Sequence, residues 1–283
     1  MSNYSLHIST TLLLLLHLLP FITSKSQWYD IALNRLYQSC TSKNFRFIQI
    51  GAYTGQTRND PIFYKVLEQQ WKGILIEPVP SIFEKLQQNY ADWSYPNGHY
   101  RQYNTATHLS FENSAICNSN QQNSSFYYLS PSVLDEIVNV LVGSTERTAQ
   151  WITRRKNVPN WSEQASSLMH DQILKILTTS FGLNNKQAKF IAFKSRIEIP
   201  CITYEALLEK YHLQLAKKED IVQIDYVHID AEGYDWDIVK AITSLASRST
   251  AKYPLPKILC YESLHIHARE NENENHHQWR YVA

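Results

Sequence analysis

Two carboxylates close a short apolar strand and could carry acid–base chemistry. The strand predicted at 221–229 runs directly into Asp230 and Glu232, with Gly233 straight after them. Residues two apart on a strand point to the same side, and open α/β folds hold ligands at the carboxyl ends of parallel strands. We therefore predict that both side chains face a ligand cleft, where one could take a proton from a substrate hydroxyl if burial raises its pKa. Alternatively, either carboxylate binds backbone amides at the start of the next helix.

A second strand that ends in glycine lies far upstream. The predicted strand 45–50 is followed by Gly51, Ala52 and Gly55, and glycine lets a backbone turn tightly and approach a ligand closely. Tyr53 occupies the position of the second glycine in the dinucleotide pattern G-x-G-x-x-G, which disfavours a nicotinamide-dependent oxidoreductase. A plain turn without a ligand is the alternative interpretation of this loop.

Glu77 ends the next predicted strand, 73–77. A carboxylate at that place can accept hydrogen bonds from the hydroxyls of a ribose. A helix-capping or solvent-facing glutamate is the alternative, and the glycine loop nearby favours the ribose role. Together, the glycine loop, Glu77 and the acidic turn indicate one nucleotide-type site built from distant parts of the chain.

The histidines and cysteines could form a metal site or a disulfide. His265 and His267 alternate after Glu262 and could hold a metal, but we predict no metal site. The four cysteines lack metal-ligand spacing. Cys117 and Cys260 stand at predicted strand ends and are expected to be buried thiols, with a Cys117–Cys201 bridge as the alternative.

The elements between these motifs alternate between strand and helix. The third predicted strand is 111–117 and the fifth is 257–262, and the rhythm indicates parallel βαβ units in a three-layer α/β sandwich. We expect one α/β domain at 25–270, a mostly helical insertion or lid at about 124–199, and a low-complexity tail at 271–283. Thr203 is expected to cap a helix through 211.

The net charge of the chain and its N-terminal residues give indications about binding partners and cellular location. The 283 residues include 27 lysines and arginines and 26 acidic residues, which gives a net charge of +1. This balance gives no indication that the protein binds nucleic acid or an anionic membrane. The apolar block 12–22 is shorter than the ~20 residues of a membrane-spanning helix and fits a signal peptide at 1–24. We expect a secretory or secreted glycoprotein with acceptors at Asn123 and Asn160; a buried first helix and a cytoplasmic location are the alternative.

Several segments together resemble the FkbM-type methyltransferase family. They keep the order and spacing of that family from about Asn44 to His265. The matching segments are 47–52, 59–62, 71–80, 113–117, 199–203 and 229–235.

The resemblance implies a class I, Rossmann-like fold that uses S-adenosyl-L-methionine to methylate a hydroxyl oxygen. Gly51, Ala52 and Gly55 would then approach the methionine part of the cofactor, and Glu77 its ribose. Ala115 and Ile116 would border the adenine. Asp230, Glu232 and His228 would lie where the methyl group and the acceptor meet.

The sequence departs from the family pattern in two places. His228 stands where many relatives carry lysine, which would make a cationic contact dependent on pH. The family fold normally continues beyond the fifth strand with a helix and a closing pair of strands. We expect that residues 264–283 cannot supply them, so that the C-terminal strands are truncated and the activity is in doubt. The favoured function is O-methylation of a sugar or another small hydroxyl acceptor; the alternative is a catalytically inactive binding protein with the same fold.

Overall fold

A computed structural model describes much of the second of two compact units, 1–42 and 43–283. The described residues are 45–55, 62–69, 71–91, 108–119, 122–142, 166–212, 223–249, 252–262 and 279–282. The predicted signal peptide, His265, His267 and Asn160 lie outside them. No helix among these residues is long and apolar enough to cross a membrane.

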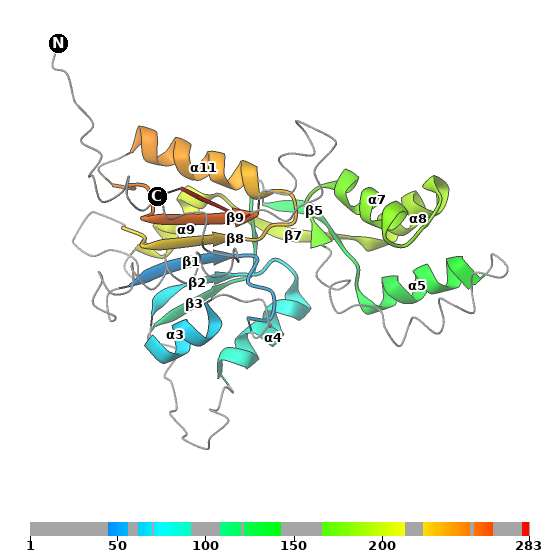
Figure 1. Ribbon diagram of the computed structural model, residues 1–283, viewed down its shortest axis with the longest axis horizontal. Helices are drawn as coiled ribbons and strands as arrows, with labels where there is room; N and C mark the ends of the chain where they lie inside the picture. The colour runs from blue at the N-terminus through cyan, green and yellow to red at the C-terminus, as the bar shows by residue number, and fades with distance from the viewer. Residues whose placement is uncertain are drawn as a thin grey trace, which may run out of the picture. The chain divides into compact units, whose positions relative to one another are not determined.

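The main sheet has six strands in the order β10-β9-β8-β1-β2-β3 (Figure 1). Five of them run parallel to their neighbours, and β10 pairs antiparallel with β9. The strands are β1 (Arg46–Ile50), β2 (Lys72–Ile76), β3 (Leu109–Glu112), β8 (Tyr226–Ile229), β9 (Ile258–Glu262) and β10 (Trp279–Val282). The α/β prediction is confirmed, whereas β10 lies in the tail from which the sequence predicted no strand, and that expectation is corrected.

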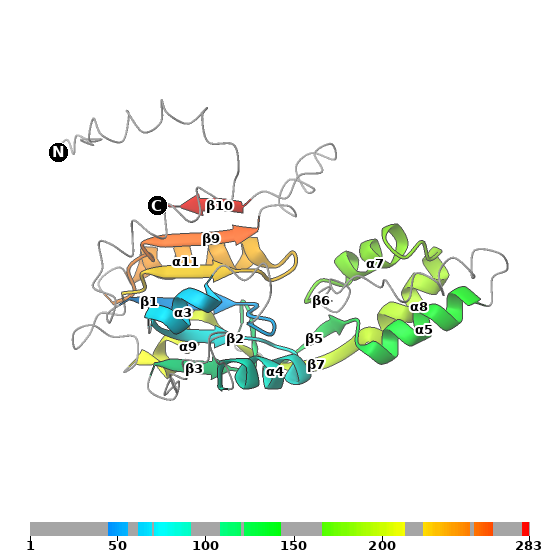
Figure 2. The same cartoon turned by 60° about the horizontal axis from the view of Figure 1, so that its bottom comes forward.

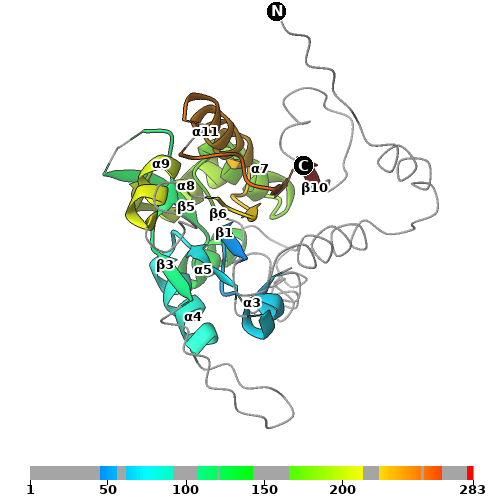
Figure 3. The same cartoon turned by 90° about the vertical axis from the view of Figure 1, so that its left-hand side faces the viewer.

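Helices cover both faces of this sheet. One face bears α9 (Tyr204–Lys210) and α11 (Asp235–Arg248), whose leucines and isoleucines share a core cluster with the strands. Figure 2 shows α3 (Phe63–Gln69) in front of the sheet and α9 and α11 behind it, and Figure 3 shows the same separation along the strands. A further helix, α4 (Pro80–Ala91), follows β2 in the sequence. Because β1 is covered on both sides, all five of its residues are buried, which is the expected state of a central parallel strand.

The amino edge of the sheet is held by a buried carboxylate. Asp225, fully buried just before β8, accepts a hydrogen bond from the backbone N–H of Arg46 at 2.9 Å. Its other oxygen pairs with the Lys257 ammonium at 2.7 Å, just before β9. The first residues of three adjacent strands are therefore linked through Asp225. This link helps to determine which residues lie side by side at the opposite edge of the sheet.

A second sheet, β4-β7-β5-β6, lies between β3 and β8 in the sequence. Its strands are β4 (Ala115–Ile116), β5 (Asn123–Tyr128), β6 (Ser166–Ser167) and β7 (Arg196–Ile202). The strand predicted at 111–117 is thus two strands in different sheets, because the chain turns at Asn113 and Ser114. β5 and β7 lead to three helices with a core of their own, α5 (Pro131–Val142), α7 (His170–Thr179) and α8 (Asn185–Ser195).

A disulfide joins Cys117 and Cys201, which are 84 residues apart in sequence. The bond links the ends of β4 and β7, which pair in parallel through Ala115 and Cys201. The expectation that Cys117 is a buried thiol is therefore wrong, because the parallel pairing brings its side chain to that of Cys201. Cys260 is a buried free cysteine, as predicted, and burial raises the pKa of its thiol to about 12.

Removing the disulfide tests its contribution to stability. We expect Cys117→Ser with Cys201→Ser to lower the free energy of unfolding by about 2–4 kcal/mol, since the bond restricts the unfolded chain. Chemical denaturation measures the change, and Cys260→Ser serves as the control variant. An oxidised wild type no more stable than the double variant would contradict this expectation.

Candidate functional site

The predicted site residues emerge from three adjacent strands. Gly51, Glu77 and Asp230 directly follow β1, β2 and β8, whose order in the sheet is β8-β1-β2. The backbone N–H groups of Gly51 and Ala52 both donate to the carbonyl of Ile76, at 3.0 and 2.9 Å. The N–H of Asp230 donates to the carbonyl of Ile50 at 2.9 Å. The structure therefore brings the glycine loop, Glu77 and the acidic turn together at the carboxyl edge.

The two glycines of the first loop are required by packing within the protein. Gly51 has φ +77°, and a Cβ atom there would lie 1.9 Å from the carbonyl oxygen of Asp230. Gly55 has φ +72°, and its Cβ would lie 2.7 Å from the Tyr90 ring and 2.9 Å from Leu86. Both positions therefore exclude a side chain, whether or not a ligand approaches the loop.

Glu77 connects the end of β2 to the glycine loop. One carboxylate oxygen accepts a hydrogen bond from the N–H of Tyr53 and the other from the N–H of Val79, both at 2.9 Å. The side chain is only 5 % exposed. Burial raises the pKa of Glu77 to about 7, although the two backbone hydrogen bonds act in the opposite direction. Each carboxylate oxygen has a second lone pair, so Glu77 retains capacity to accept hydrogen bonds from a ligand.

The turn between β3 and β4 contributes a buried hydroxyl. Asn113 donates to the carbonyls of Glu77 and Pro78, at 2.8 and 3.1 Å, which fixes this turn against the end of β2. Ser114 is only 2 % exposed, and its Oγ has no hydrogen-bond partner among the described residues. A buried polar atom without a partner is uncommon in proteins. The buried Ala115 and Ile116 follow it immediately.

The acidic turn is shaped by a third carboxylate, Asp235. Its two oxygens accept hydrogen bonds from the N–H groups of Ala231, at 3.2 Å, and Gly233, at 3.1 Å. Asp235 is 1 % exposed and begins α11, whereas Asp230 and Glu232 are only partly buried. The role of binding backbone amides at a helix start, considered for Asp230 and Glu232, is thus performed by Asp235.

Two residues of these loops adopt a backbone conformation that L-residues seldom use. Tyr53 has φ +48° in the glycine loop, and Glu232 has φ +46° in the acidic turn. Such conformations cost about 1–3 kcal/mol each and concentrate at ligand-binding and active sites. Their occurrence in both loops of one sheet edge points to that edge as the functional part of the chain.

The family comparison agrees with this arrangement. The family model for the methyltransferase FkbM domain matches residues 49–282, which contain the glycine loop, Glu77 and the acidic turn. The chain belongs to the FkbM methyltransferase family. Comparisons with curated proteins and with solved structures gave no match.

Within this FkbM-family domain, His228 lies inside β8, two residues before Asp230. It is the third residue of β8, between Gln49 of β1 and Cys260 of β9, and it is 5 % exposed. Burial lowers the pKa of His228 to about 4, so the imidazole is neutral at physiological pH. Its catalytic role remains a prediction.

Two residues of the candidate site had no predicted role. Asp235 belongs to the acidic motif, and its place in the first turn of a helix, four residues after Ala231, was the signal for an amide-binding carboxylate. No sequence pattern indicated a role for Ser114, because its side chain is buried only as a result of the chain passing from the main sheet to the second sheet after β3. Among the described residues, no group of histidine, cysteine or carboxylate side chains could hold a metal ion.

Substituting the glycine beside Asp230 tests the close contact of the two strand ends. We expect Gly51→Ala to lower the free energy of unfolding by about 3 kcal/mol or more, because a methyl group meets backbone atoms at positive φ. Gly182→Ala is the matched control, since Gly182 has φ +68° but open space around its Cβ position. Thermal unfolding compares the two, and equal losses would show that the contact with Asp230 contributes nothing.

Asp235 is tested by a substitution of the same shape that replaces one of its two acceptor oxygens. We expect Asp235→Asn to destabilise the protein by about 1–3 kcal/mol, since an amide nitrogen replaces one acceptor and leaves a backbone N–H unsatisfied. Asp237→Asn, two residues further along α11, is the control. Denaturant unfolding of both variants provides the measurement. A loss at Asp237 as large as that at Asp235 would argue against a specific role in shaping the turn.

Proposed function

We propose that this family member is an S-adenosyl-L-methionine-dependent O-methyltransferase that acts on a sugar or another small hydroxyl acceptor. The observation that carries the proposal is the meeting of Glu77, the glycine loop and the acidic turn at one sheet edge. This combination fits a ligand that has both a ribose and a charged end, because open α/β folds bind nucleotides at such an edge.

The residues present fit the cofactor. Glu77 is a buried acceptor with unused lone pairs, positioned to receive ribose hydroxyls. Ser114 Oγ has no protein partner among the described residues, and it adjoins Ala115 and Ile116, which are proposed to border the adenine. Gly51, Ala52 and Gly55 form the loop proposed for the methionine part. When bound, S-adenosyl-L-methionine supplies an electrophilic methyl group.

The protein's own contribution is to position the acceptor and to remove its proton. Asp230 and Glu232 are the proposed groups near the acceptor, and either carboxylate can take the proton of the reacting hydroxyl. The turn that carries them is held by Asp235, so their positions are fixed before an acceptor arrives. Such fixed geometry supplies much of the rate of a transfer between two bound partners.

We further propose that the chain enters the secretory route. The Cys117–Cys201 disulfide supports this location, since such bonds form and persist in oxidising compartments. Asn123, a predicted glycosylation acceptor, is exposed at the start of β5. Both observations agree with the signal peptide predicted at 1–24.

Binding and turnover separate the candidate functions. Calorimetry with S-adenosylhomocysteine on folded protein is expected to show binding, and its absence would refute the proposed cofactor. Incubation with labelled S-adenosyl-L-methionine and a panel of sugars then measures methyl transfer to hydroxyl groups. Binding without transfer to any acceptor would favour the inactive binding protein instead.

The raised pKa of Glu77 predicts a pH dependence of cofactor binding. Because the folded-state pKa lies near 7, the carboxylate gains a proton as the pH falls through 7 and loses an acceptor for ribose hydroxyls. We expect the affinity for S-adenosylhomocysteine to fall between pH 8 and pH 6, approaching about tenfold per unit below the pKa. Glu77→Gln should bind more weakly by about 1–3 kcal/mol and lose this pH dependence.

Glu112→Gln is the matched control for this measurement. Glu112 is a buried glutamate at the end of the adjacent strand β3, and its carboxylate contacts Lys210 and Tyr211, both at 2.7 Å. It has no proposed contact with the cofactor, so its variant should keep the pH dependence of the wild type. An unchanged affinity and pH profile in Glu77→Gln would remove Glu77 from the cofactor site.

A further inference from the structure

A groove of about 500 Å³ lies between α9 and α11 on the outer face of the domain. Its volume is within the range of small-molecule sites, about 300–1,000 Å³. Its walls come from the start of α9, from the residues after β4 and from one stripe of α11. None of the predicted site residues lines it.

Most of the α11 residues that line the groove are polar. Asp237, Lys240, Ser244 and Arg248 recur every three or four residues and so share one side of the helix. Across the groove stand Asn118, Ser119, Thr203 and Glu205. Small apolar surfaces of Ala241, Leu245 and Tyr204 lie between these polar groups.

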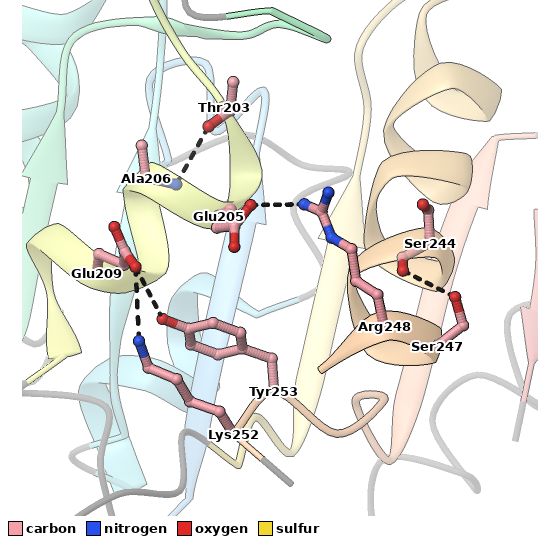
Figure 4. A network of polar contacts seen from close by, with 9 residues as sticks. All are labelled: Thr203, Glu205, Ala206, Glu209, Ser244, Ser247, Arg248, Lys252 and Tyr253. Carbon is pink, nitrogen blue, oxygen red and sulfur yellow. Dashed lines mark hydrogen bonds and ion pairs between the residues drawn. The ribbon is translucent and has the colours of Figure 1, made fainter. Parts of the chain in front are cut away.

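The charges in the groove are paired and balanced. The Arg248 guanidinium donates to Glu205 across the groove, as Figure 4 shows, and Lys240 pairs with Asp237 at 2.7 Å on the same helix. The side chains of Arg248, Lys240 and Glu205 are 59 %, 55 % and 40 % exposed. Exposed ion pairs are weak, so these side chains can turn toward a ligand at little cost.

The groove and the acidic turn are connected through the first turn of α11. Asp235, which holds that turn, and Asp237, which lines the groove, occupy the first turn of the same helix. The phenol of Tyr234, the last residue before α11, is hydrogen-bonded by the backbone of Asn118 in the opposite wall. A ligand that reaches from the groove toward Asp230 and Glu232 would therefore pass this contact.

We infer that the groove binds the non-reacting part of a neutral glycan acceptor, whose reacting hydroxyl extends to the acidic turn. Adjacent sugar hydroxyls donate and accept hydrogen bonds together, and the groove offers carboxylates, cationic donors, an amide and hydroxyls side by side. A strongly anionic ligand would meet Glu205 and Asp237, and a strongly cationic one would meet Arg248 and Lys240. This inference rests on the proposed function. It names the acceptor as a neutral glycan and adds the groove to the acidic turn as a second site where the acceptor binds.

Two double variants of the full chain test the inference. Glu205→Ala with Arg248→Ala removes the ion pair inside the groove and leaves the net charge unchanged. Glu209→Ala with Lys252→Ala removes a pair of similar exposure between α9 and the segment after α11, and this pair does not line the groove (Figure 4). Each protein is measured against immobilised neutral oligosaccharides and sulfated glycans, with S-adenosylhomocysteine present.

The expected result is selective loss of glycan binding. The wild type should retain one or more neutral oligosaccharides, the groove variant should bind them about tenfold more weakly, as loss of one or two hydrogen bonds implies, and the control should match the wild type. S-adenosylhomocysteine should bind all three proteins equally.

Three results would overturn the inference alone while cofactor binding remains intact. They are equal glycan binding by both double variants, no neutral glycan bound by the wild type, and retention of sulfated glycans only. Failure of the folded wild type to bind S-adenosylhomocysteine would instead refute the proposed function on which the inference rests.

Discussion

The absence of a side chain at Gly51 is the constraint on which the site depends. A Cβ atom there would lie 1.9 Å from the carbonyl oxygen of Asp230, so β1 and β8 can end side by side only if this residue is glycine. The same residue donates its N–H to Ile76, at the end of β2. One position without a side chain thus lets three strand ends converge, and the two loops and Glu77 obtain their relative positions from it.

The carboxylates at this edge differ in how deeply they are buried and in what they bind. Asp235 and Glu77 each accept two backbone N–H groups and are almost completely buried. Asp230 and Glu232 stay partly accessible beside them. Asp225 plays the corresponding building role at the opposite edge, where it joins the starts of β1, β8 and β9. Of these buried carboxylates, Asp225 is the one that joins β1 directly to the start of β8.

Much of this arrangement could be predicted from the sequence because it follows local patterns. The apolar strands before Gly51, Glu77 and Asp230 placed these residues at one edge of a parallel sheet, and Thr203 caps α9 as predicted, accepting from the N–H of Ala206 at 3.2 Å. The rest depends on contacts between distant segments. The break of the third predicted strand, the Cys117–Cys201 bond and the addition of β10 all arise from pairing partners, which a local pattern does not encode.

The order of strands in the main sheet also constrains how the chain reaches its folded state. β1 pairs on one side with β2, which follows it closely, but on the other side with β8, which comes late in the sequence. Until β8 has been synthesised and inserted, that side of β1 exposes unpaired backbone groups, a recognised cause of aggregation. Pairing over such a separation is slow because a long loop must close first. The glycine loop and the acidic turn can therefore come together only after β8 has paired with β1, late in the folding of the chain.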